Sequence, residues 1–318
     1  MSLNREFHTT THPAYVCHVP ERLSAPVIFE SPHHSTFFPE DFHLACDESH
    51  VHRQADLHVD KIFSDTLGAG FPFLGTRVAR SYIDFNRATN SVHPDHVTGE
   101  LSRITPAEGD FYAKAGLGLV RTRAYFGRDI PVTDTPPTED EILRRIDAYW
   151  MPYHAQLAAL IDQNIAAFGQ SCHVTCHSFP MEFMKEKDVL GDYTFFIGTS
   201  EGRSAADDVK DKVIGILTDL GFGVADNRVL KGVELVKRHG DPSQERHSVQ
   251  IEIVREQYMD NHTGEPHEGL ERIQSAMTQL ATELGSFMNQ RCQKPAPMTR
   301  EAPDPEPPSE ESGPIAAQ

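Results

Sequence analysis

The chain has 318 residues, of which 38% are hydrophobic, and its formal net charge is −18 at pH 7. This content is enough for the core of one large domain or two small ones, and the negative charge argues against nucleic acid or an anionic membrane as a partner. No apolar run approaches the roughly 20 residues of a membrane-spanning helix. The first residues hold no apolar signal core and the five cysteines are scattered, so we expect free thiols and a cytoplasmic protein.

The N-terminal part of the chain predicts a polar lead-in followed by a short strand. Residues 1–24 are polar, with several His and Pro, and we expect them to precede the domain. Residues 27–30 predict a strand, which Pro32 ends, and His33 follows at once. Because α/β proteins build their sites in the loops after buried strands, we interpret His33 as the first ligand of a metal centre. A histidine on the loop surface is the alternative.

The next segment predicts one helix, two strands and a long irregular stretch. The helix begins near Asp56, where apolar residues recur at helical spacing, and glycines stop it at 68–70. Residues 71–74 and 78–85 have the composition of strands. Residues 88–136 are rich in His, Pro, Gly and Thr, and an irregular stretch this long is usually functional or a lid.

The second half of the chain predicts strands that alternate with helices. One helix begins at Thr138, whose hydroxyl can cap it with Glu141 three residues later, and Pro152 should kink or divide it before it ends near residue 168. The other predicted elements are strands at 173–178, 193–197, 222–224 and 247–254 and helices at 205–220 and 270–288.

This alternation indicates an α/β fold with a mixed, largely parallel central sheet covered by helices on both faces. We expect one domain over residues 25–292. From residue 293 to residue 318 the composition changes to Pro, Glu, Ser and Ala, which predicts a disordered acidic tail.

Three residues from separate segments are the candidates for a metal site. His33 and His177 lie at the ends of predicted strands, and Asp56 begins a predicted helix. Catalytic zinc takes three protein ligands drawn from His and carboxylates and leaves a fourth position for water. There is no HExxH motif, so the fold itself must bring the ligands together. Asp60 is the rival of Asp56 on the same helical face, and either aspartate can instead be solvated at a helix start.

The stretch from Cys172 to His177 allows other readings. It resembles a haem-attachment motif with one residue too many, and half of a zinc knuckle whose second cysteine pair is absent. We favour the interpretation that Cys172 and Cys176 are small buried residues.

Glu252 is the candidate general base. It stands between Ile251 and Ile253 in an apolar strand, where an unpaired carboxylate is costly unless it has a function. Its role would be to accept a proton from water at the metal and to pass it to a leaving amine. A glutamate that faces solvent from an edge strand is the alternative.

Two basic clusters are candidates for binding substrate carboxylates. Arg80, Asn86 and Arg87 lie close together in the sequence, and arginine matches carboxylates in a bidentate manner. The alternative is a structural arginine–aspartate pair. Lys237 and Arg238 form the second cluster, which could hold a second carboxylate or simply be a solvated turn.

Nine segments, in this order, resemble one known family. They are Ser31-Pro-His33, Asp56-Leu-His-Val-Asp60, Arg80-Ser-Tyr-Ile-Asp-Phe-Asn-Arg87, Pro152-Tyr-His154, Cys176-His-Ser178, Gly198-Thr199, Lys231-Gly232, Ser248-Val-Gln-Ile-Glu-Ile253 and Tyr258-Met-Asp260. As an ordered set, they make the chain similar to the N-formylglutamate amidohydrolase family over about residues 25–265.

The resemblance implies a zinc-dependent amide hydrolase with a fold akin to the zinc carboxypeptidases. The residues that it assigns are the zinc ligands His33 and His177, the base Glu252 and the carboxylate-binding pair Asn86 and Arg87. The zinc carboxypeptidases have a glutamate three residues after the first histidine ligand. Thr36 stands there in this chain, so we infer that Asp56 supplies the acidic ligand.

The implied reaction is hydrolysis of N-formyl-L-glutamate to formate and L-glutamate, in histidine breakdown, with one zinc ion per chain. Arg80 is the candidate that stabilises the developing oxyanion. The expected partner is therefore a small acidic N-acyl amino acid. The alternatives are the same chemistry on another N-acyl amino acid or a peptide, and a non-catalytic relative that binds a carboxylate ligand.

The chain departs from the pattern of this family at three places. The family usually has Ser-Gly after the first histidine, Asp before Cys-His-Ser, and a second Gly after Lys-Gly. This chain has His34-Ser35, Thr175 and Val233 at those positions. Larger residues near the pocket can change which substrate fits. The missing aspartate removes a residue that would orient a metal ligand.

Overall fold

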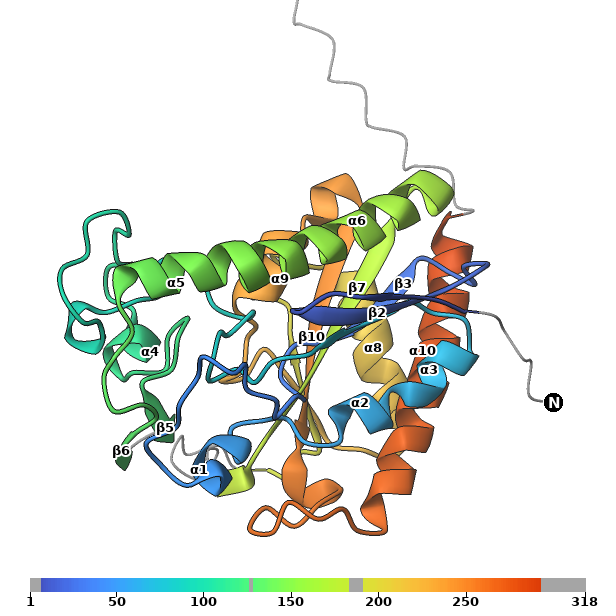
Figure 1. Ribbon diagram of the computed structural model, residues 1–318. Coiled ribbons are helices and arrows are strands. Elements are labelled where there is room, and N and C mark those ends of the chain that lie inside the picture. The colour runs from blue at the N-terminus through green and yellow to red at the C-terminus, as the bar shows by residue number, and fades with distance from the viewer. Residues whose placement is uncertain (1–6, 126–127, 183–190, 293–318) are drawn as a thin grey trace, which may run out of the picture.

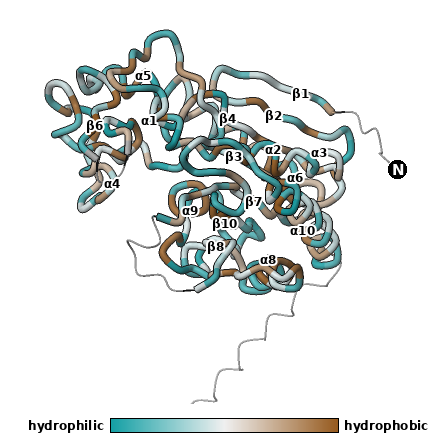
Figure 2. Tube along the Cα trace, turned by 90° about the horizontal axis from the view of Figure 1, so that it is seen from below, coloured by the Kyte–Doolittle hydropathy of each residue, from teal (hydrophilic) through white to brown (hydrophobic). Residues whose placement is uncertain are grey.

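One large sheet forms the centre of the protein (Figure 1). The computed structural model describes residues 7–125, 128–182 and 191–292. The strands of the sheet are β1 (Phe7–Thr11), β2 (Tyr15–Pro20), β3 (Val27–Ser31), β4 (Phe73–Thr76), β7 (Ser171–Phe179), β8 (Phe195–Gly198), β9 (Val224–Asp226) and β10 (Arg246–Val254). Within the described residues their order is β1-β2-β4-β3-β7-β10-β8-β9, and Figure 2 shows this order from β1 near the top to β8 near the bottom.

The strands at the centre of the sheet pair in parallel. β3 is parallel to both β4 and β7, and β7 is parallel to β10 along the full nine residues of each strand. β8 turns the other way against β10, and β1 and β2 add an antiparallel edge beside β4. The predicted mixed, largely parallel sheet is confirmed. The carboxyl ends of β3, β7 and β10 therefore meet at one edge.

Helices cover both faces of the sheet. The helices are α1 (Glu48–His52), α2 (Val59–Ile62), α3 (Ser64–Gly68), α4 (Phe111–Lys114), α5 (Glu139–Arg145), α6 (Met151–Phe168), α8 (Asp207–Asp219), α9 (Glu234–His239) and α10 (Gly269–Cys292). The apolar residues of α2, α8 and α10 share one hydrophobic cluster with the sheet, and those of α5 and α6 share another. In Figure 1, α5 and α6 run across the top and α8 and α10 lie at the right.

Alternation along the central strands separates apolar from polar side chains. Cys172, Val174 and Cys176 of β7 point into the cluster with α8 and α10, and both cysteines are buried free thiols. The intervening residues face the side of α6 and α9, which both contact β7. We call these buried polar residues of three adjacent strands the polar layer: Glu30 of β3, His173, Thr175 and His177 of β7, and Ser248, Gln250 and Glu252 of β10.

Residues 78–85 form no strand, so that prediction is wrong. Tyr82 and Ile83 are fully buried in the cluster with α6, which explains their apolar character. The backbone nevertheless turns, because the Tyr82 N–H donates to the Ala79 carbonyl at 2.9 Å and the Asp84 N–H donates to the Leu119 carbonyl at 2.8 Å. The apolar residues of this segment are explained by their burial and not by pairing in a sheet.

Two further segments differ from the expectation. β1 and β2 form an edge of the sheet from residues that the sequence predicts as a lead-in. The segment 88–136 contains α4 and a small hairpin of β5 (Arg123–Tyr125) and β6 (Arg128–Pro131). The predicted tail lies outside the described residues. None of the helices in the described ranges is long and apolar enough to cross a membrane.

The helix that begins at Thr138 is divided before Pro152. The Thr138 hydroxyl accepts from the Glu141 N–H and the Glu141 carboxylate accepts from the Thr138 N–H, so the predicted capping box is confirmed. A π-helical turn, η2 (Ile146–Trp150), then separates α5 from α6. Pro152 lies in the first turn of α6, and the wider turn before it accommodates a residue without an N–H.

A buried pair of histidines joins α6 to α9 and predicts instability in acid. His154 Nδ1 lies 2.9 Å from His239 Nε2, and the His154 Nε2–H donates to the Phe85 carbonyl at 2.9 Å. Burial lowers the pKa of His154 to about 3. Burial and the neighbouring His154 lower the pKa of His239 to about 2. The folded protein therefore keeps both rings neutral at pH values where the unfolded chain, with a pKa of about 6.5, takes up protons.

We expect the free energy of unfolding to fall as the pH is lowered from about 6.5, by up to about 1.4 kcal/mol per pH unit for each ring. The measurement is urea unfolding at pH 7 and pH 5 for the natural chain and for His154→Gln. The variant should lose less stability between the two pH values, because it has one titrating ring fewer. Equal losses would contradict the assignment of the acid sensitivity to this pair.

Candidate metal and substrate site

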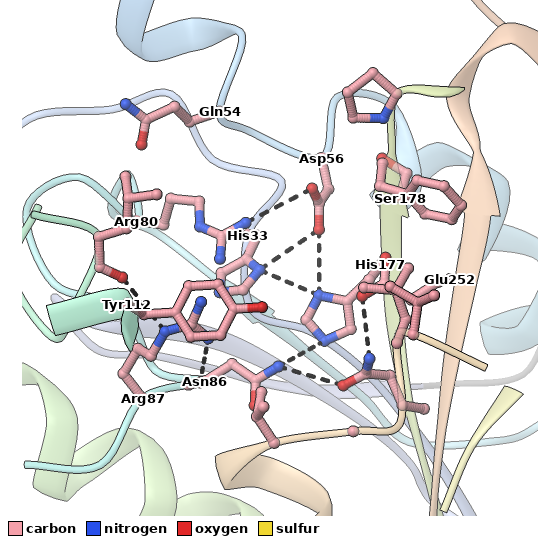
Figure 3. A pocket seen from close by; sticks show the side chains of 18 of the residues that line it. His33, Gln54, Asp56, Arg80, Asn86, Arg87, Tyr112, His177, Ser178 and Glu252 are labelled. Atoms are coloured by element: carbon pink, nitrogen blue, oxygen red, sulfur yellow. Dashed lines mark hydrogen bonds and ion pairs between the residues drawn. The ribbon is translucent and has the colours of Figure 1, made fainter. Parts of the chain in front are cut away.

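Three buried side chains converge at the carboxyl ends of the central strands (Figure 3). His33 follows β3, His177 lies near the end of β7, and Asp56 lies between α1 and α2. The two histidine Nδ1 atoms are 3.1 Å apart, and Asp56 Oδ2 lies 3.2 Å from His177 Nδ1 and 3.5 Å from His33 Nδ1. These ligand atoms all lie within 4.8 Å of one another. The parallel strands position the two histidines, because adjacent strands end at the same edge.

The donor set fits a divalent cation. His33 Nε2 lies 2.7 Å from the carboxylate of Asp84, so this nitrogen carries the hydrogen and Nδ1 presents its lone pair. That lone pair faces His177 Nδ1 and Asp56 Oδ2, and all three residues are buried. Two histidines and one carboxylate are a ligand set that zinc uses in catalytic sites, with a further position open.

Carboxylates and arginines fix these ligands from outside. Asp84 Oδ2 accepts from Arg80 Nη2 at 2.8 Å, and Asp56 Oδ1 accepts from Arg255 Nη2 at 2.9 Å. Burial would raise the pKa of Asp56, but its contacts with the rings of His177 and His33 and the charge of Arg255 hold it well below its ordinary value. Asp56 is therefore ionised, and Arg255 occupies the oxygen that does not face the histidines.

Asp56 and Asp60 do not share a helical face. The sequence predicts a helix from Asp56, but α2 begins only at Val59, because His58 has a left-handed backbone with φ of 65°. Asp56 thus lies before the helix, where its N–H donates to the His33 carbonyl at 2.9 Å. Asp60 lies in the first turn of α2 and is not part of the converging group.

Glu252 lies beside the converging ligands and not on an edge strand. β10 is flanked by β7 and β8, and Glu252 pairs across the parallel ladder with His177. The side chain is 8% exposed, and its Oε1 accepts from Gln250 Nε2 at 3.0 Å. Burial raises the pKa of Glu252 to about 7. A carboxyl with such a pKa can both take up and release a proton near neutral pH.

A cavity of about 1050 Å³, counted with the solvent at its mouth, opens over these residues. Of the described residues, those with basic side chains that line it are Arg53, Arg80, Arg87, Arg121, Arg255 and Lys231. The acidic side chains that line it are Asp56 and Glu252. The formal net charge of the chain is −18, so the net positive charge of the cavity-lining side chains is opposite to the charge of the protein as a whole. Such a cavity favours an anionic ligand.

Residues 25–259 match the family of N-formylglutamate amidohydrolases. The chain belongs to the N-formylglutamate amidohydrolase family. This family membership and its relatives assign the chain to the hydrolases that act on linear amide bonds.

Two relatives and one solved structure support this membership. An N-formylglutamate deformylase of Pseudomonas putida is 24% identical over 207 residues, which are 64% of this chain and 70% of the relative. A protein of the same name from Pseudomonas aeruginosa is 23% identical over 243 residues, 76% of this chain and 84% of the relative. The crystal structure of N-formylglutamate amidohydrolase from Ralstonia eutropha JMP134 has a TM-score of 0.81 and 29% identity, covering 88% of this chain and 99% of that one.

The first basic cluster lines the cavity in this family member. Arg80 and Arg87 both line it, and Arg87 lies over the ring of Tyr112 at 4.3 Å. Asn86 is buried, and its Oδ1 accepts from the Leu235 N–H at 3.0 Å, which directs its Nδ2 toward the converging ligands.

The second basic cluster is not part of the cavity wall. Lys237 and Arg238 lie on α9, outside the lining residues. Arg238 packs over Trp150 at 4.7 Å and pairs with Glu234 one turn earlier.

Sequence reasoning missed three arginines of the wall, Arg53, Arg121 and Arg255. Arg121 Nη2 donates to Asp84 Oδ2 at 3.1 Å, and burial together with the nearby Arg80 lowers the pKa of Arg121 to about 9. Arg255 follows β10 directly and holds Asp56. Its place three residues after Glu252, at the carboxyl end of a strand, was the available signal. Arg121 lies in the irregular segment 88–136, where no local pattern indicates a site.

The three departures from the family pattern lie at different places relative to the cavity. His34 is not among the cavity-lining residues, and its ring packs against Gly75. Val233 lines the cavity, so its side chain takes up space near the substrate. Thr175 lies behind His177, with its Oγ1 2.9 Å from His177 Nε2.

Proposed function

We propose that this chain is a metal-dependent amidohydrolase of N-acyl acidic amino acids, with N-formyl-L-glutamate as the first candidate and formate and L-glutamate as products. The observation that carries the proposal is the group of three converging ligand atoms beside the buried Glu252, in a cavity with a basic wall. The names of the two Pseudomonas relatives support the choice of substrate.

His33, Asp56 and His177 would hold the metal, with zinc as the first candidate. When bound, such an ion polarises a carbonyl oxygen and lowers the pKa of water. The chain's own contribution is to fix both histidines with Nδ1 toward one point and to keep Asp56 ionised. All three side chains are buried, and they line the cavity.

Glu252 would accept the proton of the attacking water and pass it to the departing amino group. Its carboxyl lies on the strand next to His177, which places it on the polar side of the sheet at the floor of the cavity. Water attack forms the bond to the formyl carbon, the C–N bond breaks, and the amine leaves with the transferred proton. Arg80 is the candidate that stabilises the negative oxygen formed between these steps.

Two carboxylates of the substrate would meet the basic wall. Arg87 and Asn86 are our candidates for the α-carboxylate, as the sequence predicts. Arg121 and Arg53 line the same cavity and replace Lys237 and Arg238 as the candidates for the side-chain carboxylate.

The test is release of the free amino acid by zinc-loaded protein from N-formyl-L-glutamate, N-acetyl-L-glutamate, N-formyl-L-glutamine and N-formyl-L-leucine, with formate or, from the acetyl compound, acetate as the second product. The proposal expects the highest kcat/KM for N-formyl-L-glutamate. A preference for another member of the panel would keep the amide hydrolysis and change the substrate. Tight binding of N-formyl-L-glutamate with no turnover by metal-loaded protein would sink the proposal in favour of a carboxylate-binding protein.

Arg80→Lys should lower kcat by about 100-fold or more, because a lysine keeps the charge but cannot both pair with Asp84 through Nε and Nη2 and reach an oxyanion. The Michaelis constant should change much less, since the effect belongs to the transition state. Steady-state kinetics with metal content checked in parallel gives the answer. A variant with an unchanged kcat and a raised KM would move Arg80 from the oxyanion to substrate binding.

A further inference from the structure

The long segment 88–136 brings a tyrosine to the cavity that the proposed reaction does not yet use. Tyr112 lies on the short helix α4 and lines the cavity. Figure 3 shows its hydroxyl directed toward the side of the cavity where His33 and His177 lie. The side chain is partly buried, and its hydroxyl forms no hydrogen bond with another residue of the described ranges. This hydroxyl is therefore available to a ligand.

The backbone around Tyr112 is anchored. Asp110 caps α4 by accepting from the Ala113 N–H at 3.0 Å, and the Ser91 hydroxyl donates to the same carboxylate at 2.6 Å. The Tyr112 carbonyl accepts from the Leu117 N–H at 2.8 Å. The side chain thus projects into the cavity from a fixed turn.

The ring of Tyr112 lies against one face of Arg87. The guanidinium carbon of Arg87 is 4.3 Å from the ring centroid, a distance at which an aromatic ring attracts a cation. Two carbonyls hold the guanidinium from its own side of the cavity, because Nη1 donates to Asn86 at 2.9 Å and Nε donates to Leu117 at 3.4 Å. Arg87 Nη2 has no partner among the described residues. Arg87 is therefore held in one orientation with donors left for a carboxylate.

The arginines nearest to the metal ligands have carboxylate partners, whereas Arg87 has none. Arg80 and Arg121 both pair with Asp84, at 2.8 Å and 3.1 Å. Arg87 forms no ion pair within the described residues, so its charge is open to a carboxylate of the substrate. A substrate that pairs with Arg87 and places its acyl group at the metal ligands has to pass the hydroxyl of Tyr112, which is directed the same way.

We infer that Tyr112 is a further substrate-binding residue, whose hydroxyl donates to the α-carboxylate of the N-acyl amino acid and whose ring fixes the Arg87 guanidinium on the same carboxylate. The inference rests on the proposed function and deepens it. A phenol is a neutral donor, so it adds a hydrogen bond without a further cation in a basic wall. It also gives the segment 88–136 a function, because α4 belongs to that segment.

The test is the affinity for N-formyl-L-glutamate, measured by titration calorimetry on zinc-loaded Glu252→Gln protein, in which the substrate should persist. Tyr112→Phe in this background removes only the hydroxyl and should raise the dissociation constant by about 10-fold, as for the loss of a hydrogen bond to a charged group. Tyr112→Leu also removes the ring and should raise it by about a further three- to fivefold. In the active chain, Tyr112→Phe should raise KM and leave kcat nearly unchanged, because the contact is present before and during the reaction.

A second ligand identifies the group that the hydroxyl contacts. N-formyl-4-aminobutanoate is N-formylglutamate without the α-carboxylate, so Tyr112→Phe should change its affinity by less than about twofold. Two control variants lie outside the cavity lining. Tyr149→Phe removes the hydroxyl of another partly buried tyrosine, and Phe111→Leu removes the neighbouring, exposed ring of α4. Both should bind N-formyl-L-glutamate as the parent does.

Unchanged affinity for N-formyl-L-glutamate in Tyr112→Phe would overturn the inference. An equal loss for both ligands would also overturn it, because the hydroxyl would then contact another group. Equal affinities of the Tyr112→Phe and Tyr112→Leu variants would remove the role of the ring at Arg87. Zinc content and thermal unfolding of each variant show that the fold and the metal site are intact.

These outcomes leave the proposed function standing when the natural chain still hydrolyses N-formyl-L-glutamate. Failure of the proposed function shows instead as a zinc-loaded natural chain without turnover, in which case the calorimetric comparison still decides the role of Tyr112. A Glu252→Gln parent that does not bind N-formyl-L-glutamate would overturn both.

Discussion

Glu252→Gln is expected to lower kcat by about 100- to 10,000-fold, the range that a positioned acid–base group contributes. The amide has nearly the shape of the carboxyl but cannot take up a proton from water. Gln250 can still donate to the remaining oxygen at this position, so the local structure should persist. Formate release under saturating substrate, with zinc content measured on the same sample, is the direct measurement.

The matched control for this change is Glu256→Gln. Glu256 lies just after β10, accepts from the Met181 N–H and is not among the residues that line the cavity. It should retain the natural kcat. Normal turnover by a folded, zinc-loaded Glu252→Gln variant would remove Glu252 from the mechanism, whatever the control shows.

Asp56→Asn should abolish stoichiometric metal binding at micromolar zinc. The amide keeps the shape of the side chain but lacks the charge that faces the two histidines, so zinc affinity should fall by more than the about 10- to 100-fold loss that outer partners cause. Turnover should fall with it and return only in part at high zinc. The readouts are metal content after dialysis and formate release as a function of free zinc.

Asp60→Asn is the control for that change and decides between the two aspartates of the sequence motif. Asp60 is half-buried on α2, outside the converging group, so its variant should keep the metal. Metal loss in Asp60→Asn with retention in Asp56→Asn would reverse the assignment.

Strand periodicity made much of the fold and part of the candidate site predictable. β7 and β10 were recognisable because polar and apolar residues alternate over residues 171–177 of the first strand and 248–253 of the second. The same alternation, with the rule that parallel strands end at one edge, brings His177 and Glu252 to the same place. Apolar composition predicts a strand wrongly where residues are buried but form no regular secondary structure. The turns of residues 78–85 are as apolar as a strand, and only their contacts with α6 explain why.

Contacts between residues that are distant in the sequence were the second reason why parts of the site could not be predicted. Arg121 acquires its role from Asp84 and Gln54, which are distant in the sequence. The left-handed residue His58 breaks the helix that spacing predicts, and this break separates Asp56 from Asp60. Lys237 and Arg238 form a plausible anion site by composition, but α9 uses them outside the cavity. Charge in a sequence does not say which way a short helix faces.

The three candidate metal ligands lie on parts of the fold that we expect to differ in rigidity. This difference should determine the rate at which a bound metal dissociates. His33 and His177 are attached to the buried central strands, whereas Asp56 belongs to a segment of short helices between α1 and α3. Amide hydrogens of β7 should exchange only on global unfolding, and those of the 48–68 segment through local opening. The dissociation rate of the metal should therefore follow the exchange rate of this segment. Substitutions that loosen α1 or α2 would speed metal loss without lowering the melting temperature to a similar extent.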